Sequence, residues 1–221
     1  MRKTCLEMVR RLALEDERIV FIGSDLGRGV LDDLRREAPE RFFAEGIMEA
    51  HVTGMAAGMA LEGKIPYVNT IASFLTRRCY EQIALDLCLH GAPARLIGNG
   101  GGLVYAPLGP THQTIEDFAI LRALPGMTVF APADAEEMKR LMPATVDLPG
   151  PAYIRLGKGF DPIVTPDASG FEVGRGVLAR DGDDALLVTT GVMLGPCLEA
   201  AELLESRGLA AAVLHMPTVK P

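Results

Sequence analysis

Short apolar runs alternate along the chain with longer stretches in which apolar residues recur every three or four positions. The short runs predict β-strands at 18–25, 65–70, 94–99, 127–134 and 152–156. The longer stretches predict helices at 3–15, 30–37, 49–61, 76–90, 114–123 and 134–146. Strands that alternate with helices through short polar turns indicate an α/β fold, a doubly wound, mainly parallel sheet with helices on both faces.

The pattern changes after residue 157. Gly, Pro, Asp and Ser dominate 157–176, as in a linker. One further βαβ unit follows, with a strand at 185–191, a helix after Pro196 and a strand at 210–216. We therefore expect a first α/β domain over 1–158, a linker over 159–176 and the beginning of a second α/β domain over 177–221. Because one βαβ unit buries little apolar surface, we also expect the natural chain to continue beyond Pro221.

The predicted helix at 49–61 lacks a polar face. His51 and Thr53 alone interrupt a run of Ala, Gly, Met, Val and Leu after Ala50, which is typical of a helix buried on every side. Glu49 nevertheless stands at its start. An acid in a first turn gains about 0.3–1 kcal/mol from the helix dipole, so Glu49 is explained either by that gain or by a chemical role.

Composition and charge exclude several classes of function. The 221 residues carry a net charge of −7 without a basic stripe, which argues against nucleic acid or an anionic membrane as a partner. The sequence contains neither a signal peptide nor an uncharged apolar run of the roughly 18 residues that a membrane span needs. Its four cysteines form no CxxC pair and have no histidine at metal-ligand spacing, which favours reduced thiols in a cytoplasmic protein and no metal site of its own.

Candidate chemistry gathers after strand ends and in two further stretches. Ligands of such sheets bind beyond the carboxyl ends of the strands, where Asp25 stands. Each candidate also has an ordinary explanation: Asp25 as a capping acid, Phe74 as a core aromatic, His112 as a solvated turn residue, and Arg78 with Glu81 as a surface pair. The glycines at 100–102 are not followed by the residues of a phosphate-binding loop.

Several stretches together carry more information than each one alone. "RFFAEGIMEAHVTGMAAGMALEGKIPYV", Phe74, "RCYEQI", "GPTHQTIEDFAILRALPGMTVFAPAD" and "GPAYIRLGKG" follow one another in the order and spacing of the transketolase family. The chain most resembles the C-terminal subunit of split transketolases, with the deoxyxylulose-phosphate synthases as relatives. The resemblance covers the whole chain and implies a pyrimidine-binding domain for thiamine diphosphate, followed by the start of the family's C-terminal domain.

The resemblance also implies roles for single residues. Glu49 matches the glutamate that faces N1′ of the cofactor's aminopyrimidine and promotes removal of the thiazolium C2 proton. Phe74 matches the aromatic that stacks on the pyrimidine, and Asp25 an acidic position near the cofactor and the interface between subunits. His112 matches a substrate-facing histidine. Lys158 stands where relatives often have an arginine that contacts the substrate's phosphate.

Other positions match the family less informatively or depart from it. Arg78 and Gln82 match an R-x-[YF]-[ED]-Q pattern that we interpret as architectural. Leu108 replaces an aspartate that contacts a sugar hydroxyl in relatives, and Gly100–Gly102 lie where sugar-phosphate transketolases have a phosphate-binding histidine. These departures predict a non-standard donor or acceptor sugar.

The resemblance predicts a subunit of a transketolase that moves a two-carbon ketol unit from a ketose to an aldose. The chain lacks a GDG…Asn motif for Mg²⁺ and diphosphate, so we expect an N-terminal transketolase subunit as partner, in an α₂β₂ heteromer. One alternative is the β-subunit of a 2-oxo-acid dehydrogenase, which predicts decarboxylation and a lipoyl partner; "GPTHQ" and "RCYEQI" argue against it. A second is a non-catalytic stabilising subunit, which the presence of Glu49, Phe74 and His112 disfavours.

Overall fold

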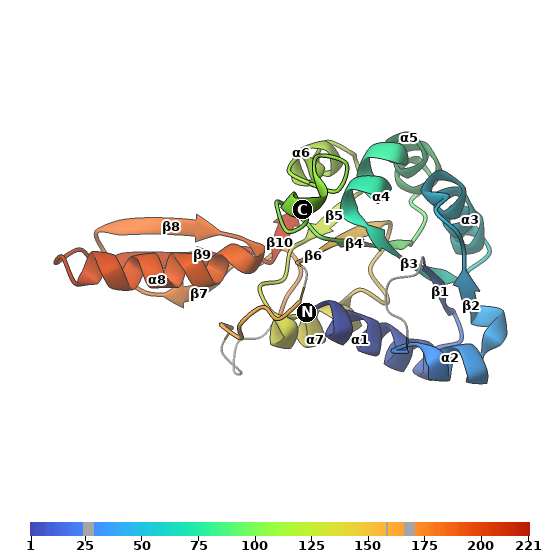
Figure 1. Ribbon diagram of the computed structural model, residues 1–221, viewed down its shortest axis with the longest axis horizontal. Helices are drawn as coiled ribbons and strands as arrows, with labels where there is room; N and C mark the ends of the chain where they lie inside the picture. The colour runs from blue at the N-terminus through green and yellow to red at the C-terminus, as the bar shows by residue number, and fades with distance from the viewer. Residues whose placement is uncertain (24–28, 158, 166–170) are drawn as a thin grey trace.

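A seven-stranded sheet forms the centre of the molecule (Figure 1). The computed structural model describes residues 1–23, 29–157, 159–165 and 171–221. The strand order is β10-β5-β6-β4-β3-β1-β2, and every pairing in this sheet is parallel except that of β10 with β5. The strands are β1 (Ile19–Gly23), β2 (Phe42–Ala44), β3 (Ile65–Ile71), β4 (Arg95–Asn99), β5 (Thr128–Phe130), β6 (Ala152–Leu156) and β10 (Thr218–Lys220). The predicted α/β class with a mainly parallel sheet is confirmed.

Helices cover both faces of this sheet (Figure 1). On one face lie α1 (Arg2–Glu15), α2 (Asp32–Glu37) and α7 (Ala135–Ala144); on the other lie α3 (Glu49–Leu61), α4 (Ala72–Arg78), α5 (Tyr80–Gln82), a π-helical segment (Ile83–Leu89) and α6 (Asp117–Arg122). Neighbouring strand residues point to opposite faces, so that Phe21 joins the cluster under α1 and α7 while Ile22 joins the cluster under α3 and α4. The central strands are therefore buried on both sides.

The structure corrects several predicted boundaries. The helix predicted to begin at residue 76 begins at Ala72, so that Phe74 lies within it. The helix predicted to begin at residue 114 begins only at Asp117, because Thr114 forms an isolated antiparallel bridge with Gly102 instead. The strands β2, β7 (Val177–Arg180) and β10 were not predicted at all. Each of them has only three or four residues, too few for a hydrophobic period to show.

Helix α3 is another correction. It was predicted to be buried on every side, and its residues Val52, Ala56 and Ala60 do pack into the core. On its opposite side, however, Gly58 and Leu61 are exposed, Leu61 to 59%. The apolar stretch therefore presents one uncovered face in this chain.

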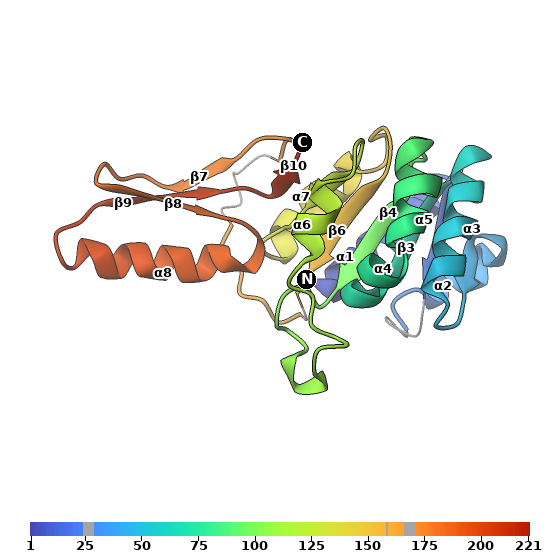
Figure 2. The ribbon, with the colours of Figure 1, turned by 90° about the horizontal axis from the view of Figure 1, so that it is seen from above.

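A second, smaller sheet follows the linker and projects from one end of the first (Figure 1). Its order is β7-β9-β8, with β8 (Ala185–Thr189) and β9 (Ala211–His215) parallel and joined through the 3₁₀ turn η4 (Gly191–Met193) and α8 (Leu194–Glu205). Helix α8 covers one face of it (Figure 2). The side chains of Leu178, Leu186 and Val188 are each more than half exposed.

Specific contacts join the two sheets. The strand β10, which follows β9 directly, returns to the first sheet, where Thr218 pairs with Phe130. A buried hydrogen bond connects His215 Nε2 at the end of β9 with Glu137 Oε2 in α7 at 2.8 Å. Other polar side chains complete the fold: the fully buried Arg95 donates to the carbonyl oxygens of Val146, Leu148 and Gly150.

In the described part of the chain, no helix combines the length and the apolar character that crossing a membrane requires.

Candidate functional site

Glu49 is the first residue of α3 and its side chain is buried, with 5% of its surface exposed. Arg78 Nη1 donates a hydrogen bond to its Oε2 at 3.0 Å, and Thr70 Oγ1 lies 3.4 Å from its Oε1. Thr70 belongs to the end of β3, so the carboxylate lies at the rim where the carboxyl ends of the parallel strands meet. A buried carboxylate requires hydrogen-bond partners, and here a cation and a hydroxyl provide them.

Arg78 connects this carboxylate to Phe74. The guanidinium carbon of Arg78, one helical turn further along, lies 3.8 Å from the centroid of the Phe74 ring. The ring of His112 approaches Phe74 in an edge-to-face arrangement, with the ring centroids 4.9 Å apart. Glu49, Phe74 and His112 come from three separate stretches of sequence, and the structure brings them into one cluster through Arg78.

The partner of Arg78 was not predicted from the sequence. Arg78 was interpreted as architectural or as the partner of Glu81, whereas its ion pair is with Glu49. The signal was present in the spacing, because residues at i and i+4 of a helix face the same way. Had the helix been predicted to begin at Ala72, Phe74 and Arg78 would have been assigned to one face.

The loop that carries His112 is held at its base and along its length. Backbone hydrogen bonds between Gly102 and Thr114, at 2.6 and 2.9 Å, close its base. From α4, Ser73 Oγ donates to Thr111 O at 2.8 Å, and Arg77 donates to the carbonyl oxygens of Pro110 and Gln113 at 2.8 and 2.7 Å. The loop, drawn in green, extends beyond the sheet in Figure 2. Its position relative to Phe74 is therefore fixed by the same helix that carries Phe74.

The His112 side chain is half-buried within this loop. Its Nδ1 lies 2.9 Å from Thr111 Oγ1, and the centroid of its ring lies 6.5 Å from that of Tyr105. The exposed residue Leu108 lies in the short 3₁₀ turn η3 (Ala106–Leu108) at the end of the same loop. The imidazole is thus oriented by neighbours and still accessible to a small molecule.

A buried polar group under the loop was not predicted from sequence. Asp117 is fully buried, accepts a hydrogen bond from the Tyr153 hydroxyl at 2.8 Å and lies 3.1 Å from Arg155 Nε. Burial raises the pKa of Asp117, although Arg155 and Tyr153 act in the opposite direction. Arg155 also donates to Thr114 O at 2.9 Å. It thereby connects the buried aspartate to the base of the His112 loop.

Two predicted site residues, Asp25 and Lys158, lie outside the described residues. Within the described ranges, no group of three or more His, Cys, Asp or Glu side chains is arranged to hold a metal ion. A buried carboxylate beside a half-buried phenyl ring fits the aminopyrimidine half of thiamine diphosphate, which needs an acid at one ring nitrogen and a flat apolar surface.

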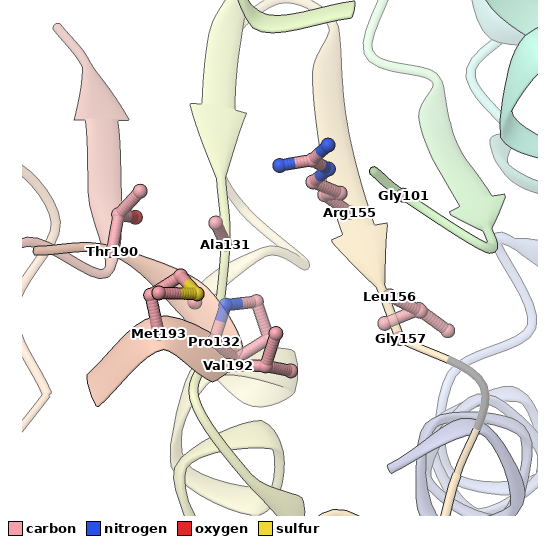
Figure 3. Close-up of a pocket in the computed structure, with 10 residues that line it drawn as sticks. Gly101, Ala131, Pro132, Arg155, Leu156, Gly157, Thr190, Val192 and Met193 are labelled. Atoms are coloured by element: carbon pink, nitrogen blue, oxygen red, sulfur yellow. The ribbon is translucent and has the colours of Figure 1, made fainter. Parts of the chain in front are cut away.

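A small cavity lies close by, where the two sheets meet (Figure 3). The ends of β5 and β6 contribute Ala131, Pro132 and Arg155, and the segment after β8 contributes Val192 and Met193. Its volume of about 50 Å³ is far below the roughly 300 Å³ or more of ordinary ligand pockets. We therefore assign the site to the Glu49–Phe74–His112 cluster and not to this cavity.

Comparison with known proteins agrees with this geometry. The transketolase pyrimidine-binding domain matches residues 1–160, and the transketolase C-terminal domain matches residues 174–221. The chain is 33% identical over 222 residues to the 6-deoxy-6-sulfo-D-fructose transketolase subunit SqwH of a Clostridium species, covering 100% of this chain and 69% of that protein. It is also 33% identical to one of the subunits of the apulose-4-phosphate transketolase of Phocaeicola vulgatus, covering 100% of this chain and 71% of that protein.

A solved structure described as a split gene transketolase, an inactive β₄ tetramer, superimposes with a TM-score of 0.88 at 36% identity. It covers 98% of this chain and 71% of its own. The chain spans 61%, 69% and 71% of the first three curated relatives that it matches. Because the pyrimidine-binding domain matches most of its length and the described residues superimpose on a split transketolase, this chain belongs to the transketolase family.

Proposed function

We propose that this chain is one subunit of a thiamine-diphosphate-dependent transketolase, a transferase that moves a two-carbon ketol unit from a ketose to an aldose. The observation that carries the proposal is the position of the Glu49 carboxyl group. It is buried at the start of α3, beside the Phe74 ring and within the cluster that contains His112. The transketolase relatives support this function over a 2-oxo-acid dehydrogenase subunit and over a purely stabilising role.

When bound, thiamine diphosphate supplies a carbon nucleophile for breaking and forming the C–C bond. In the proposal, the Glu49 carboxyl group would share a proton with N1′ of the pyrimidine and so hold that ring in position. Phe74 provides a flat surface against which the ring is oriented. His112 donates a hydrogen bond to the substrate oxygen that becomes negatively charged during the reaction.

The remaining parts of the proposal concern the partner subunit, two further residues of this chain, its division into domains and its location. An N-terminal transketolase subunit would hold Mg²⁺ and the diphosphate, in an α₂β₂ heteromer. Asp25 would lie near the cofactor and Lys158 near an anionic substrate group. The chain divides in this proposal into a pyrimidine-binding domain at 1–158, a linker at 159–176 and the start of the C-terminal domain at 177–221. The four free thiols are consistent with a cytoplasmic enzyme.

The substrate we propose is a sugar other than the common pentose phosphates. Leu108 is an exposed apolar residue in the loop that carries His112, and Gly100–Gly102 provide no imidazole at the end of β4. A site that offers no polar partner to a hydroxyl or phosphate loses selectivity for it. Two relatives are named for other sugars, one for 6-deoxy-6-sulfo-D-fructose and the other for apulose 4-phosphate.

The function is tested on the native complex. The chain is purified with its natural partner, the partner is identified by mass spectrometry, and exchange of the cofactor C2 proton is followed by NMR. Glu49→Ala should abolish C2 proton exchange and turnover while the complex still assembles. Glu62→Ala, the same change at the exposed far end of α3, should leave both unchanged. Normal C2 proton exchange in Glu49→Ala would refute the assigned role.

A further inference from the structure

We propose that the Arg78 guanidinium and the pyrimidine ring of the cofactor compete for the same two partners, the Glu49 carboxylate and the face of Phe74. Arg78 must therefore turn away when the cofactor binds. This inference rests on the proposed function. It assigns Arg78 to the cofactor site, whereas its place in the sequence pattern suggested a purely architectural role.

The first argument is geometric. Arg78 Nη1 lies 3.0 Å from Glu49 Oε2, and the Arg78 guanidinium carbon lies 3.8 Å from the centroid of the Phe74 ring. One planar group thus donates a hydrogen bond to the buried acid and stacks on the neighbouring aromatic ring at the same time. These are the two contacts that the aminopyrimidine needs from this chain. The His112 ring also packs against Phe74 in a T-shaped arrangement, with the ring centroids 4.9 Å apart.

The second argument is chemical similarity. A guanidinium is planar and delocalised, stacks on aromatic faces and donates hydrogen bonds in its own plane to a carboxylate. An aminopyrimidine is also planar, stacks on a phenyl ring and is held by a carboxyl group at a ring nitrogen. Two flat groups cannot occupy one face of Phe74 and bond to the same carboxylate oxygen together. Binding of one therefore excludes the other.

The third argument is that Arg78 is free to move. Its side chain is 48% exposed, and within the described residues Glu49 is the single hydrogen-bond partner of its guanidinium. Arg77, the adjacent arginine, is held in contrast by Glu116 and by the carbonyl oxygens of Pro110 and Gln113. The two arginines thus differ in function: Arg77 holds the loop in place, and Arg78 exchanges between Glu49 and solvent.

Competition predicts the size of the effect on affinity. The apparent dissociation constant equals the intrinsic dissociation constant divided by the fraction of molecules in which the site is open. If Arg78 contacts Glu49 and Phe74 in about nine molecules out of ten, the site is open in about one in ten, and cofactor binding is weakened about tenfold. The contacts between the partner subunit and the diphosphate would then offset the free-energy cost of displacing Arg78.

The test is calorimetric titration of thiamine diphosphate with Mg²⁺ into the complex of this chain with its natural partner. Arg78→Ala should bind the cofactor about tenfold more tightly than the wild type. Arg78→Lys, which keeps the charge but loses the plane that stacks on Phe74, should fall between them. Arg122→Ala removes the same charge from the end of α6, away from the cluster, and should match the wild type. Equal or weaker binding by Arg78→Ala overturns the competition.

A second measurement reads the position of Arg78 directly. In NMR spectra of the full chain, the Arg78 side-chain protons should be shielded by the Phe74 ring and lose this shielding in Phe74→Leu and on addition of cofactor to the complex. Arg78 signals that stay shielded while the cofactor is bound overturn the proposal and leave the function intact. If none of the complexes binds the cofactor, the proposed function fails, and the competition with it.

Discussion

Replacing Asp134 by alanine removes an acceptor on which two separate segments converge. Asp134 is the N-cap of α7, and its Oδ1 accepts hydrogen bonds from the backbone N–H groups of Glu136 and Glu137, both at 2.9 Å. Its Oδ2 accepts from the N–H groups of Val164 and Thr165 at 2.8 and 2.7 Å, and the Thr165 hydroxyl adds a further hydrogen bond. One fully buried carboxylate thus starts a helix and holds the segment that leaves the first sheet.

The magnitude follows from these contacts. Loss of an N-cap side chain costs about 0.5–2 kcal/mol, and each hydrogen bond to a charged acceptor contributes about 1.5–3 kcal/mol. Neighbouring contributions do not add fully, because the Thr165 hydroxyl can turn to another partner. We therefore expect Asp134→Ala to lower the free energy of unfolding by about 3–5 kcal/mol, a large part of the roughly 5–15 kcal/mol of a typical domain.

Urea denaturation at pH 7, followed by circular dichroism, measures this loss. Asp134→Asn keeps an N-cap of similar quality but places an amide opposite the N–H groups of Val164 and Thr165, so it should lose about 2–3 kcal/mol. Glu136→Ala removes an i,i+3 pair with Lys139 and should lose less than about 0.5 kcal/mol. A loss in Asp134→Ala no larger than that in Glu136→Ala would refute the assignment.

The same carboxylate makes stability depend on pH. Burial acts to raise the pKa of Asp134, but the hydrogen bonds from Glu137, Thr165 and Val164 outweigh it, so that the pKa lies below its ordinary value. Because the unfolded chain binds the proton more tightly, the stabilisation is complete above about pH 4, the unfolded pKa, and is lost as the pH falls through the folded pKa. The stability difference between wild type and Asp134→Asn should therefore shrink below pH 4.

Three further predictions concern other contacts. Arg95→Met leaves the carbonyl oxygens of the 146–150 turn without a donor and should lower the free energy of unfolding by about 2–4 kcal/mol in urea denaturation; an unchanged midpoint and slope would contradict this. Arg77→Ala removes two hydrogen bonds between α4 and the His112 loop and leaves the one from Ser73. Proteolytic cleavage of the loop should accelerate and kcat/KM of the complex should fall about tenfold or more, with Arg122→Ala as the unchanged control. Across a panel of ketoses and aldoses, a modified or non-phosphorylated sugar should give the highest kcat/KM; the prediction fails if xylulose 5-phosphate with ribose 5-phosphate is best at about 10⁴ M⁻¹s⁻¹ or more.

The parts of the fold that sequence predicted are those with strong periodic patterns. Strand β1, for example, is a short apolar run that is buried throughout, because helices cover both faces of the sheet. Strand β10, by contrast, has three residues and pairs with β5 across a separation of nearly ninety residues. No local pattern encodes such a partner, because the pairing depends on where the second sheet places the chain.

The sequence likewise predicted some features of the candidate site and not others. Glu49, Phe74 and His112 were predicted from motifs, and the structure brings the three together. The spacing of Phe74 and Arg78 could have placed both on one helix face. It could not have shown that Arg78 pairs with Glu49 while the adjacent Arg77 pairs with Glu116. Arg78 turns toward Glu49 and Arg77 toward the loop. That difference depends on the direction in which α4 runs across the sheet, which spacing alone does not determine.

The return of β10 to the first sheet has a consequence for synthesis on the ribosome. One edge of β5 (residues 128–130) can pair with β6 as soon as β6 has been synthesised. The other edge has no partner until residues 218–220 of β10 have been synthesised. At about 5–20 residues per second, synthesis of the stretch from Leu156 to Lys220 takes roughly 3–13 seconds. During it the nascent chain exposes an unpaired strand edge, a template for joining another chain. Slow translation of the second sheet should therefore lower the yield of native protein more than slow translation of the first.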